Sequence, residues 1–259
     1  MTSDPVRSPS AGPARLVRPT STFAILSVLA LCAVILVPAA PGAGTKDAKR
    51  WTDRFDTSTC AWSSTGKTDF FILEPGYRQV FEGHEDKDSV HLEITVLGET
   101  QTVAGIETRV VEEKETHNGA LEEISRNLFA VCGPGNDVFY FGEAVDMYKD
   151  GKVANHEGAW TANTGGAKAG LFMPARPLLG ARFYQEIAPG VAMDRVEIVS
   201  DSESLKSPAG GFDGCVKTEE TTPLEPDAKE YKIFARGVGL VQDGTLVLVK
   251  YGLTPGQKP

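Results

Sequence analysis

Apolar and polar residues alternate along much of the chain, and this pattern predicts β-strands. Between Val90 and Val96, apolar residues alternate with His91, Glu93 and Thr95, which is typical of a strand with one buried and one solvated face. Similar runs recur at short spacing and give about ten predicted strands. No segment keeps a 3.6-residue apolar period over 12 or more residues, so we expect no long helix.

Tight-turn dipeptides separate several of these runs. Asn118-Gly119, Asp150-Gly151 and Asp243-Gly244 each lie between strand-like segments, and such pairs accept the positive φ angles that two-residue hairpin turns require. Glu74-Pro75-Gly76 predicts a further turn at the start of the domain. Strands joined in sequence by short turns indicate an all-β fold, a single antiparallel meander that forms a closed or partly open barrel.

Residues 155–180 interrupt this regular spacing. The segment is rich in glycine and proline, and it predicts a long loop that is neither strand nor helix and acts as a lid or plug over one end of the barrel. The residues responsible are Gly158, Gly165, Gly166, Gly170, Pro174, Pro177 and Gly180.

The N-terminal segment predicts export. Arginines precede an apolar run from Phe23 to Val37, and small residues follow it, as in a secretory signal peptide. We therefore expect a signal peptide over residues 1–44, a linker over 45–68, a barrel-like domain over 69–254 and a tail over 255–259. Cleavage would leave a secreted or periplasmic protein, whereas an uncleaved segment would anchor the same extracytoplasmic domain to the membrane.

The net charge of the chain narrows its possible partners. The chain carries a formal charge of −9. Residues 1–44 contribute three arginines and one aspartate, so the remainder carries −11. An acidic domain repels nucleic acid and anionic membrane surfaces. The expected partner is a small molecule or an envelope component, and membrane contact is expected only through an uncleaved N-terminal segment.

Three cysteines remain after residue 44, namely Cys60, Cys132 and Cys215. Export permits a disulfide, and an odd count leaves one thiol over or all three unpaired. The three possible pairings stay open at this point. The spacings contain no Cys-x-x-Cys motif for zinc or redox chemistry.

Candidate chemistry gathers between residues 137 and 200. Glutamates, aspartates and a histidine there could do acid–base work on a sugar or peptide, although charged residues along a strand are usually its solvated face. The catalytic candidates are Glu143, His156, Glu186 and Asp194, with Asp146 and Glu197 nearby. The candidate ligand-binding residues are Tyr140, Glu143, Tyr148, His156, Trp160, Met173, Tyr184 and Glu186. The aromatic members could equally be core.

Neither a metal site nor a cofactor site is predicted. His156-Glu157 begins like the His-Glu-x-x-His zinc motif, but Trp160 occupies the position of the second histidine. The phosphate-loop and serine-nucleophile motifs are also incomplete.

A set of short motifs is spread over residues 70 to 250. They are Phe71 to Tyr77, Thr108 to Glu113, Val138 to Glu143, His156 to Trp160, Met173 to Ala175, Tyr184 to Glu186, Pro223 to Pro226 and Gly237 to Gly239. Together they resemble an uncharacterised family of exported bacterial proteins. The resemblance implies a single extracytoplasmic domain and carries no activity or site residue with it.

These observations favour an exported binding or envelope-associated module over an enzyme. One alternative is a small extracytoplasmic hydrolase or lyase that uses paired carboxylates on polysaccharide. The other is a purely structural barrel whose interior is filled by side chains.

Overall fold

The computed structural model describes residues 50–254, so the expected signal peptide and C-terminal tail lie outside the described residues. Within this range every regular element is a strand. The first nine are β1 Ala61–Ser63, β2 Gly66–Lys67, β3 Ile72–Leu73, β4 Tyr77–Glu85, β5 Asp88–Val103, β6 Ile106–His117, β7 Ala120–Gly133, β8 Asp137–Lys149 and β9 Lys152–Asn155. The others are β10 Trp160–Thr161, β11 Lys168–Met173, β12 Arg182–Tyr184, β13 Glu186–Ile187, β14 Arg195–Ser207, β15 Gly210–Thr221, β16 Glu230–Ala235, β17 Gly239–Asp243 and β18 Leu246–Leu253.

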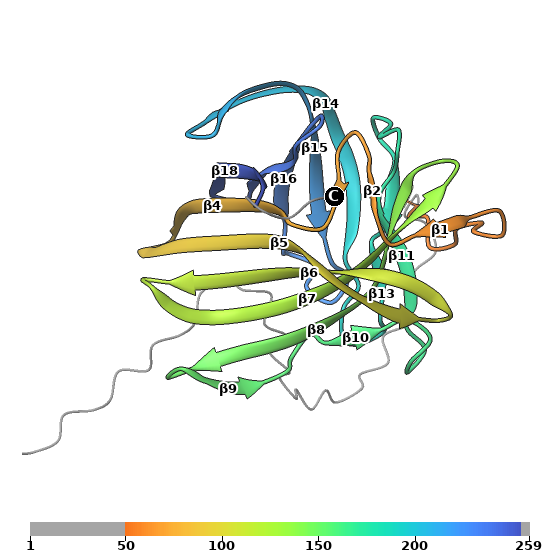
Figure 1. Ribbon diagram of the computed structural model, residues 1–259, viewed down its shortest axis with the longest axis horizontal. Coiled ribbons are helices and arrows are strands. Elements are labelled where there is room, and N and C mark those ends of the chain that lie inside the picture. The colour runs from red at the N-terminus through yellow and green to blue at the C-terminus, as the bar shows by residue number, and fades with distance from the viewer. Residues whose placement is uncertain (1–49, 255–259) are drawn as a thin grey trace, which may run out of the picture.

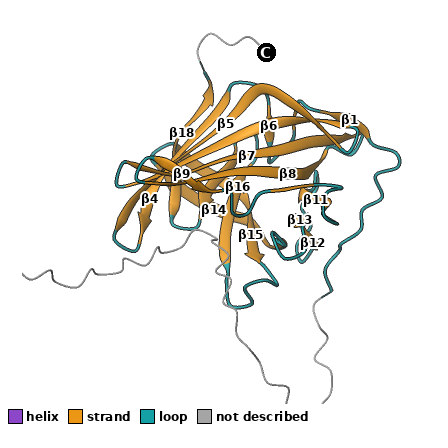
Figure 2. Ribbon diagram, turned by 90° about the horizontal axis from the view of Figure 1, so that it is seen from below, coloured by secondary structure: helices purple, strands orange, loops and turns teal. Residues whose placement is uncertain are grey.

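All strands except β2 and β3 form one antiparallel sheet that curls almost into a closed barrel, which confirms the predicted fold class (Figures 1 and 2). The order of the sheet is β12-β14-β15-β16-β17-β18-β4-β5-β6-β7-β8-β11-β13. Most neighbours are also consecutive in the chain, as in a meander, but the first strands of the path come from the C-terminal half. β18 pairs with β4, and this pairing joins the two halves of the wall.

The only break in this wall, within the described chain, lies between β12 and β13, and the chain itself crosses it. The two strands are separated by the single residue Gln185. The backbone N–H of Gln185 donates to the carbonyl oxygen of Asp194 at 2.8 Å, while its side-chain amide donates to the carbonyl oxygen of Phe172 on β11 at 3.1 Å. Gln185 therefore links the two edges, although no ladder of backbone hydrogen bonds seals them.

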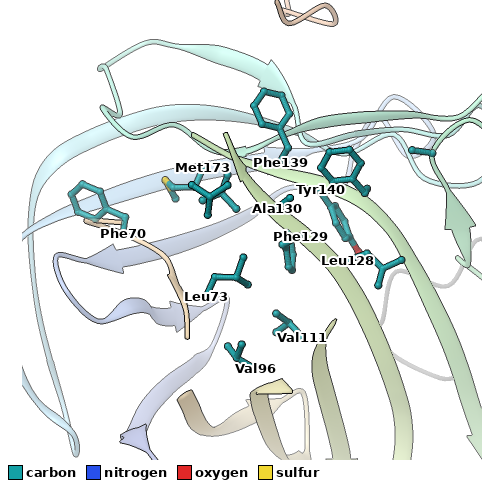
Figure 3. Close-up of a cluster of buried hydrophobic side chains, with 14 of the residues drawn as sticks. Phe70, Leu73, Val96, Val111, Leu128, Phe129, Ala130, Phe139, Tyr140 and Met173 are labelled. Atoms are coloured by element: carbon teal, nitrogen blue, oxygen red, sulfur yellow. The ribbon is translucent and has the colours of Figure 1, made fainter. Parts of the chain in front are cut away.

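A large apolar core fills one part of the barrel (Figure 3). Figure 3 shows Val96, Val111 and Phe129 within the curled sheet, with Leu73 beside them. Leu73 belongs to the short β2–β3 hairpin, which is not part of the wall. Its fully buried side chain and that of Phe70 make this hairpin an internal plug.

A second, smaller core lies where the long β14–β15 hairpin meets the β4–β18 region. Phe81 and Leu248 are fully buried there, and Phe212 from β15 packs against the same cluster. The backbone N–H of Ala209, at the hairpin tip, donates to the carbonyl oxygen of Leu248 at 3.3 Å. The projecting hairpin seen in Figure 1 is thus tied back to the wall.

The predicted turns occur with one small difference in register. Asn118-Gly119 and Asp150-Gly151 both adopt positive φ angles and connect paired strands. At the third site Asp243 pairs with Leu246, so the turn residues are Gly244 and Thr245, one position later than expected.

The expectation that residues 155–180 contain no strand was wrong. β10 and β11 both pair with β8 and form part of the wall. Glycine serves close backbone approach here: a Cβ at Gly170 would lie 2.4 Å from the carbonyl oxygen of Gln185, and one at Gly142 would lie 2.8 Å from that of Trp160. The glycines of this region therefore mark places where two backbone segments approach closely, as well as loops.

The region expected to be a linker also contains structure. β1 pairs with the end of β7, and Cys60 and Cys132 form a disulfide across this contact. Cys215 is free and buried. The disulfide thus joins residues before position 69 to the barrel and resolves the three possible pairings. No helix in residues 50–254 is long and apolar enough to cross a membrane.

Candidate functional site

The barrel encloses a cavity of about 200 Å³. This volume is somewhat larger than an apolar cavity of about 150 Å³ that holds benzene, and it is below the range of about 300 to 1,000 Å³ for pockets of drug-sized ligands. Its lining comes from strands all around the barrel, so the space is interior. The cavity can therefore hold a small molecule.

One side of the cavity is aromatic. Phe129 and Tyr140 stack with ring centroids 4.8 Å apart, and Phe172 meets the Phe129 ring edge-on, also at 4.8 Å. Phe71, from the internal plug, packs against both Phe129 and Phe172. These four rings pack against one another and form an apolar wall of the cavity.

Acidic residues also line the cavity. Six lining residues carry a carboxyl group and one carries an ammonium group. They are Glu113, Glu143, Glu186, Asp194, Glu220, Asp243 and Lys232. Such groups are rarely buried together unless something compensates their charge.

The carboxyl groups of Glu143, Glu186 and Asp194 form a cluster, which we call the carboxyl trio. Glu143 lies on β8 opposite Asn127 and Trp160. Glu186 is the first residue of β13, and Asp194 directly precedes β14. The break between β12 and β13, which we call the seam, brings Glu186 and Asp194 together. The backbone N–H groups of Gln185 and Glu186 both donate to the carbonyl oxygen of Asp194 there. The trio therefore exists because the barrel closes at this point.

Burial sets the proton affinities of the trio. Burial, with the nearby carboxylates of Glu123 and Glu113, raises the pKa of Glu143 to about 8. Burial and the adjacent Asp194 carboxylate raise the pKa of Glu186 well above its usual value. Burial also raises the pKa of Asp194, although hydrogen bonds from Glu186 and Thr222 oppose the rise. Each group thus keeps its proton to a higher pH than an exposed carboxyl would.

The lysine of the cavity is already paired. Lys232 Nζ lies 3.2 Å from Asp243 Oδ1 and 3.4 Å from Glu220 Oε2. Burial alone would lower its pKa, but these carboxylates and others nearby raise it well above the usual value, so Lys232 stays charged. Burial raises the pKa of Glu113 and of Glu220 to about 7, and Lys232 partly offsets both rises.

A second, smaller cavity of about 90 Å³ shares the carboxyl trio with the first. Its other lining residues belong to connections outside the barrel wall, among them Gly158, Val191 and Leu224. Leu224 is 38% exposed. The trio thus stands between the interior cavity and a pocket near the surface.

The structure brings only some of the sequence-predicted site residues together. Tyr140, Glu143, Glu186 and Asp194 line the cavity. Trp160 does not line it, but its ring packs edge-on against Tyr140 at 5.2 Å. The assignment of a ligand to any of them stays a prediction.

The other candidates lie elsewhere. Met173 is fully buried in the apolar core, and Tyr148 and Tyr184 are half-buried on β8 and β12 without lining the cavity. His156 is exposed, with Nδ1 lying 3.0 Å from Asp146 Oδ1. Glu197 accepts a hydrogen bond from Arg182 Nη2 at 2.7 Å.

Sequence reasoning did not select four charged lining residues, Glu113, Glu220, Lys232 and Asp243. Each lies on a β-strand, where a charged residue is usually read as solvated. The sequence indicated their burial only through residues two positions away, which lie on the same face of a strand. Glu113 shares a strand face with Val111, and Lys232 shares one with Phe234.

Residues 50–254 contain no group of three or more His, Cys, Asp or Glu arranged to hold a metal ion. The trio therefore offers carboxyl groups for hydrogen bonding and charge pairing and lacks a coordination shell for a metal.

No family model, no curated protein and no solved structure matches this chain.

Proposed function

We propose that this chain is an exported binding protein that holds a small molecule inside its barrel. The observation that carries the proposal is the interior cavity of about 200 Å³, in which an aromatic wall lies next to polar groups. That combination is usual for small-molecule sites. The export part rests on the signal-like sequence of residues 1–44, and a disulfide suits an oxidising compartment.

The cavity favours binding over a purely structural role. A barrel that serves only as a scaffold can fill its interior with apolar side chains, at lower cost than burying carboxyl groups. Here the interior instead keeps open space next to Glu143 and Glu186. Such an arrangement costs stability and is expected where it serves a ligand.

A hydrolase or lyase is the second candidate, because three carboxyl groups converge in one place. Two observations speak against action on polysaccharide. Glu186 and Asp194 are hydrogen-bonded to each other, closer than the separation of about 5 to 9.5 Å between glycosidase carboxyls. A cavity of about 200 Å³ is also too small for several sugar units.

Native mass spectrometry of the purified protein, before and after denaturation, tests the binding function. We expect the folded protein to carry a small-molecule mass that is lost on unfolding. Val111→Phe, which adds a ring at a buried lining position, should abolish the extra mass. Val153→Phe, on a 45% exposed side chain, should retain it.

The proposal fails if the folded wild-type protein shows only the polypeptide mass under conditions that preserve weak complexes. It fails equally if Val111→Phe, shown to be folded by circular dichroism, retains the same small molecule as the wild type. In that case the molecule binds outside the barrel.

A further inference from the structure

The charge balance of the cavity is incomplete. The ammonium group of Lys232 neutralises part of the acidic lining by pairing with Asp243 and Glu220. Among residues 50–254, no ion pair reaches Glu113 or any member of the carboxyl trio. A buried carboxylate without a cation is strongly disfavoured. Lys232 acts on Asp194 only at longer range, so the trio can be neutralised either by protons or by a bound cation.

One atom of the trio points directly to a ligand. Glu186 is only 5% exposed, yet its Oε2 has no hydrogen-bond partner. The indole Nε1 of Trp160 lies close enough to lower the pKa of Glu186 in part, although it too makes no hydrogen bond. An unpaired buried carboxylate oxygen destabilises the folded protein. A donor from a bound molecule would remove that cost.

The aromatic wall supplies the complementary surface. The rings of Phe129, Tyr140 and Phe172 lie within one cavity with Glu143 and Glu186. Aromatic faces attract cations and also contact the apolar carbons attached to them. An anion would find no cationic partner in the trio, and a neutral molecule would leave the trio to be neutralised by protons alone.

We propose that the ligand is a small organic amine whose ammonium group hydrogen-bonds to Glu143, Glu186 and Asp194 and whose carbon skeleton contacts the aromatic wall. This inference rests on the proposed binding function. A primary or secondary amine fits better than a quaternary one, because only N–H groups can donate to Glu186 Oε2. The volume of about 200 Å³ suits a benzene-sized group with a short aminoalkyl chain, or a short diamine.

The second cavity places the trio within reach of a pocket near the surface. The trio lines both the interior space and the smaller outer pocket. An ammonium group that approaches from the side of Leu224 therefore meets these carboxyl groups before it reaches the interior. The same residues would select for positive charge at entry and hold it once bound.

Proton affinity adds a measurable signature. The titratable groups facing Glu143 and Glu186 come from β6, β7, β8 and the residue before β14, and they are Glu113, Glu123, Tyr140 and Asp194. Asp194 in turn faces Lys232 and Glu225. Lys232 is the one base among these groups and is already paired with Asp243 and Glu220, so the trio binds protons when no other cation is present. A bound amine must displace those protons, and its affinity should rise with pH, by up to about tenfold per pH unit for each proton displaced.

Isothermal titration calorimetry with matched probe pairs tests the inference. The pairs are 2-phenylethylamine with 2-phenylethanol, and 1,4-diaminobutane with 1,4-butanediol, so that each alcohol replaces an ammonium group without changing the skeleton. We expect at least one amine to bind about 100-fold or more tightly than its alcohol at pH 7.5. Its affinity should rise between pH 6 and pH 8.

Variants locate the binding. Glu186→Gln should weaken the amine at least about tenfold, while Glu157→Gln, the same change on an exposed residue outside the cavity, should leave it unchanged. Glu143→Gln gives a second test if Glu186→Gln does not fold, and the wild-type comparison of amine with alcohol depends on neither variant.

Equal binding of an amine and its alcohol would overturn the inference and leave the binding function standing. The same holds if native mass spectrometry finds a retained neutral or anionic molecule. If no amine binds and no mass is retained, both the ligand class and the binding function are wrong.

Discussion

The buried carboxyl of Glu143 makes the stability of the ligand-free protein depend on pH in a direction opposite to that of ordinary surface acids. Burial, followed by the carboxylates of Glu123 and Glu113, raises its pKa from 4.5 to about 8. Between these values the folded state keeps a proton that the unfolded chain has lost. The contribution of Glu143 to stability is therefore complete below about pH 4.5 and is lost as the pH rises toward 8.

The size of this effect follows from the same two pKa values. One pH unit corresponds to about 1.4 kcal/mol per group, so the interval from 4.5 to about 8 allows at most about 5 kcal/mol. Glutamine has nearly the same shape and does not ionise. Near pH 5 the Glu143→Gln variant should therefore match the wild type. Near pH 8 it should be more stable by about 1 to 3 kcal/mol, once local rearrangement and water entry are allowed for.

Urea unfolding followed by tryptophan fluorescence at pH 5, 6, 7 and 8 measures the difference. The wild-type free energy of unfolding should fall over this range, and the Glu143→Gln variant should fall less steeply. Glu157→Gln removes an exposed carboxyl and should follow the wild type. Parallel curves for Glu143→Gln and wild type would refute the reasoning, because they would mean that Glu143 titrates like a solvated glutamate.

Two further predictions concern the construction of the barrel. Replacing both Cys60 and Cys132 by serine should lower the free energy of unfolding by about 4 kcal/mol, since the disulfide closes a loop with a sequence separation of 72; unchanged stability in urea would show that the bond does not constrain the unfolded chain. Gly170→Ala places a Cβ 2.4 Å from the carbonyl oxygen of Gln185 and should lower Tm by several degrees, about 2 to 8 °C for each kcal/mol lost. In Gly98→Ala the added Cβ would have no other atom within 4 Å, so this variant should leave Tm nearly unchanged. Equal Tm values for the two variants would contradict the close contact between Gly170 and Gln185.

Local chemistry made the hairpins predictable. Asn118-Gly119 and Asp150-Gly151 adopt the positive φ angles that their residue types favour, and this preference needs no information from the rest of the chain. The alternation from Val90 to Val96 likewise identified a strand correctly. Short-range signals were sufficient wherever the structure depends on neighbouring residues.

The polar interior was only partly predictable, because period-two alternation identifies two faces without saying which one encloses space. On β6 the face that carries Val111 continues with Glu113, and both line the cavity. Burial of Glu113 becomes evident only when the sheet curls and brings Lys232 from β16 near it. Glu143, Glu186 and Asp194 were selected from their clustering in the sequence, whereas their contact depends on closure of the barrel.

Long-range contacts account for the remaining differences. The space that Gly170 leaves open is occupied by the backbone of Gln185, and nothing in the local sequence distinguishes such a glycine from one in a loop. The choice of Cys60 and Cys132 among three possible pairs required the pairing of β1 with the end of β7. These features depend on the whole fold.

The way the barrel closes also bears on its behaviour at high concentration. The two strands at the ends of the sheet, β12 and β13, have only three and two residues. The outer edge of β12 is already occupied, because the N–H groups of Thr52 and Tyr184 donate to the carbonyl oxygens of Arg182 and Thr52, each at 3.0 Å. A second molecule thus finds little free strand edge at this break in the wall on which to add a strand.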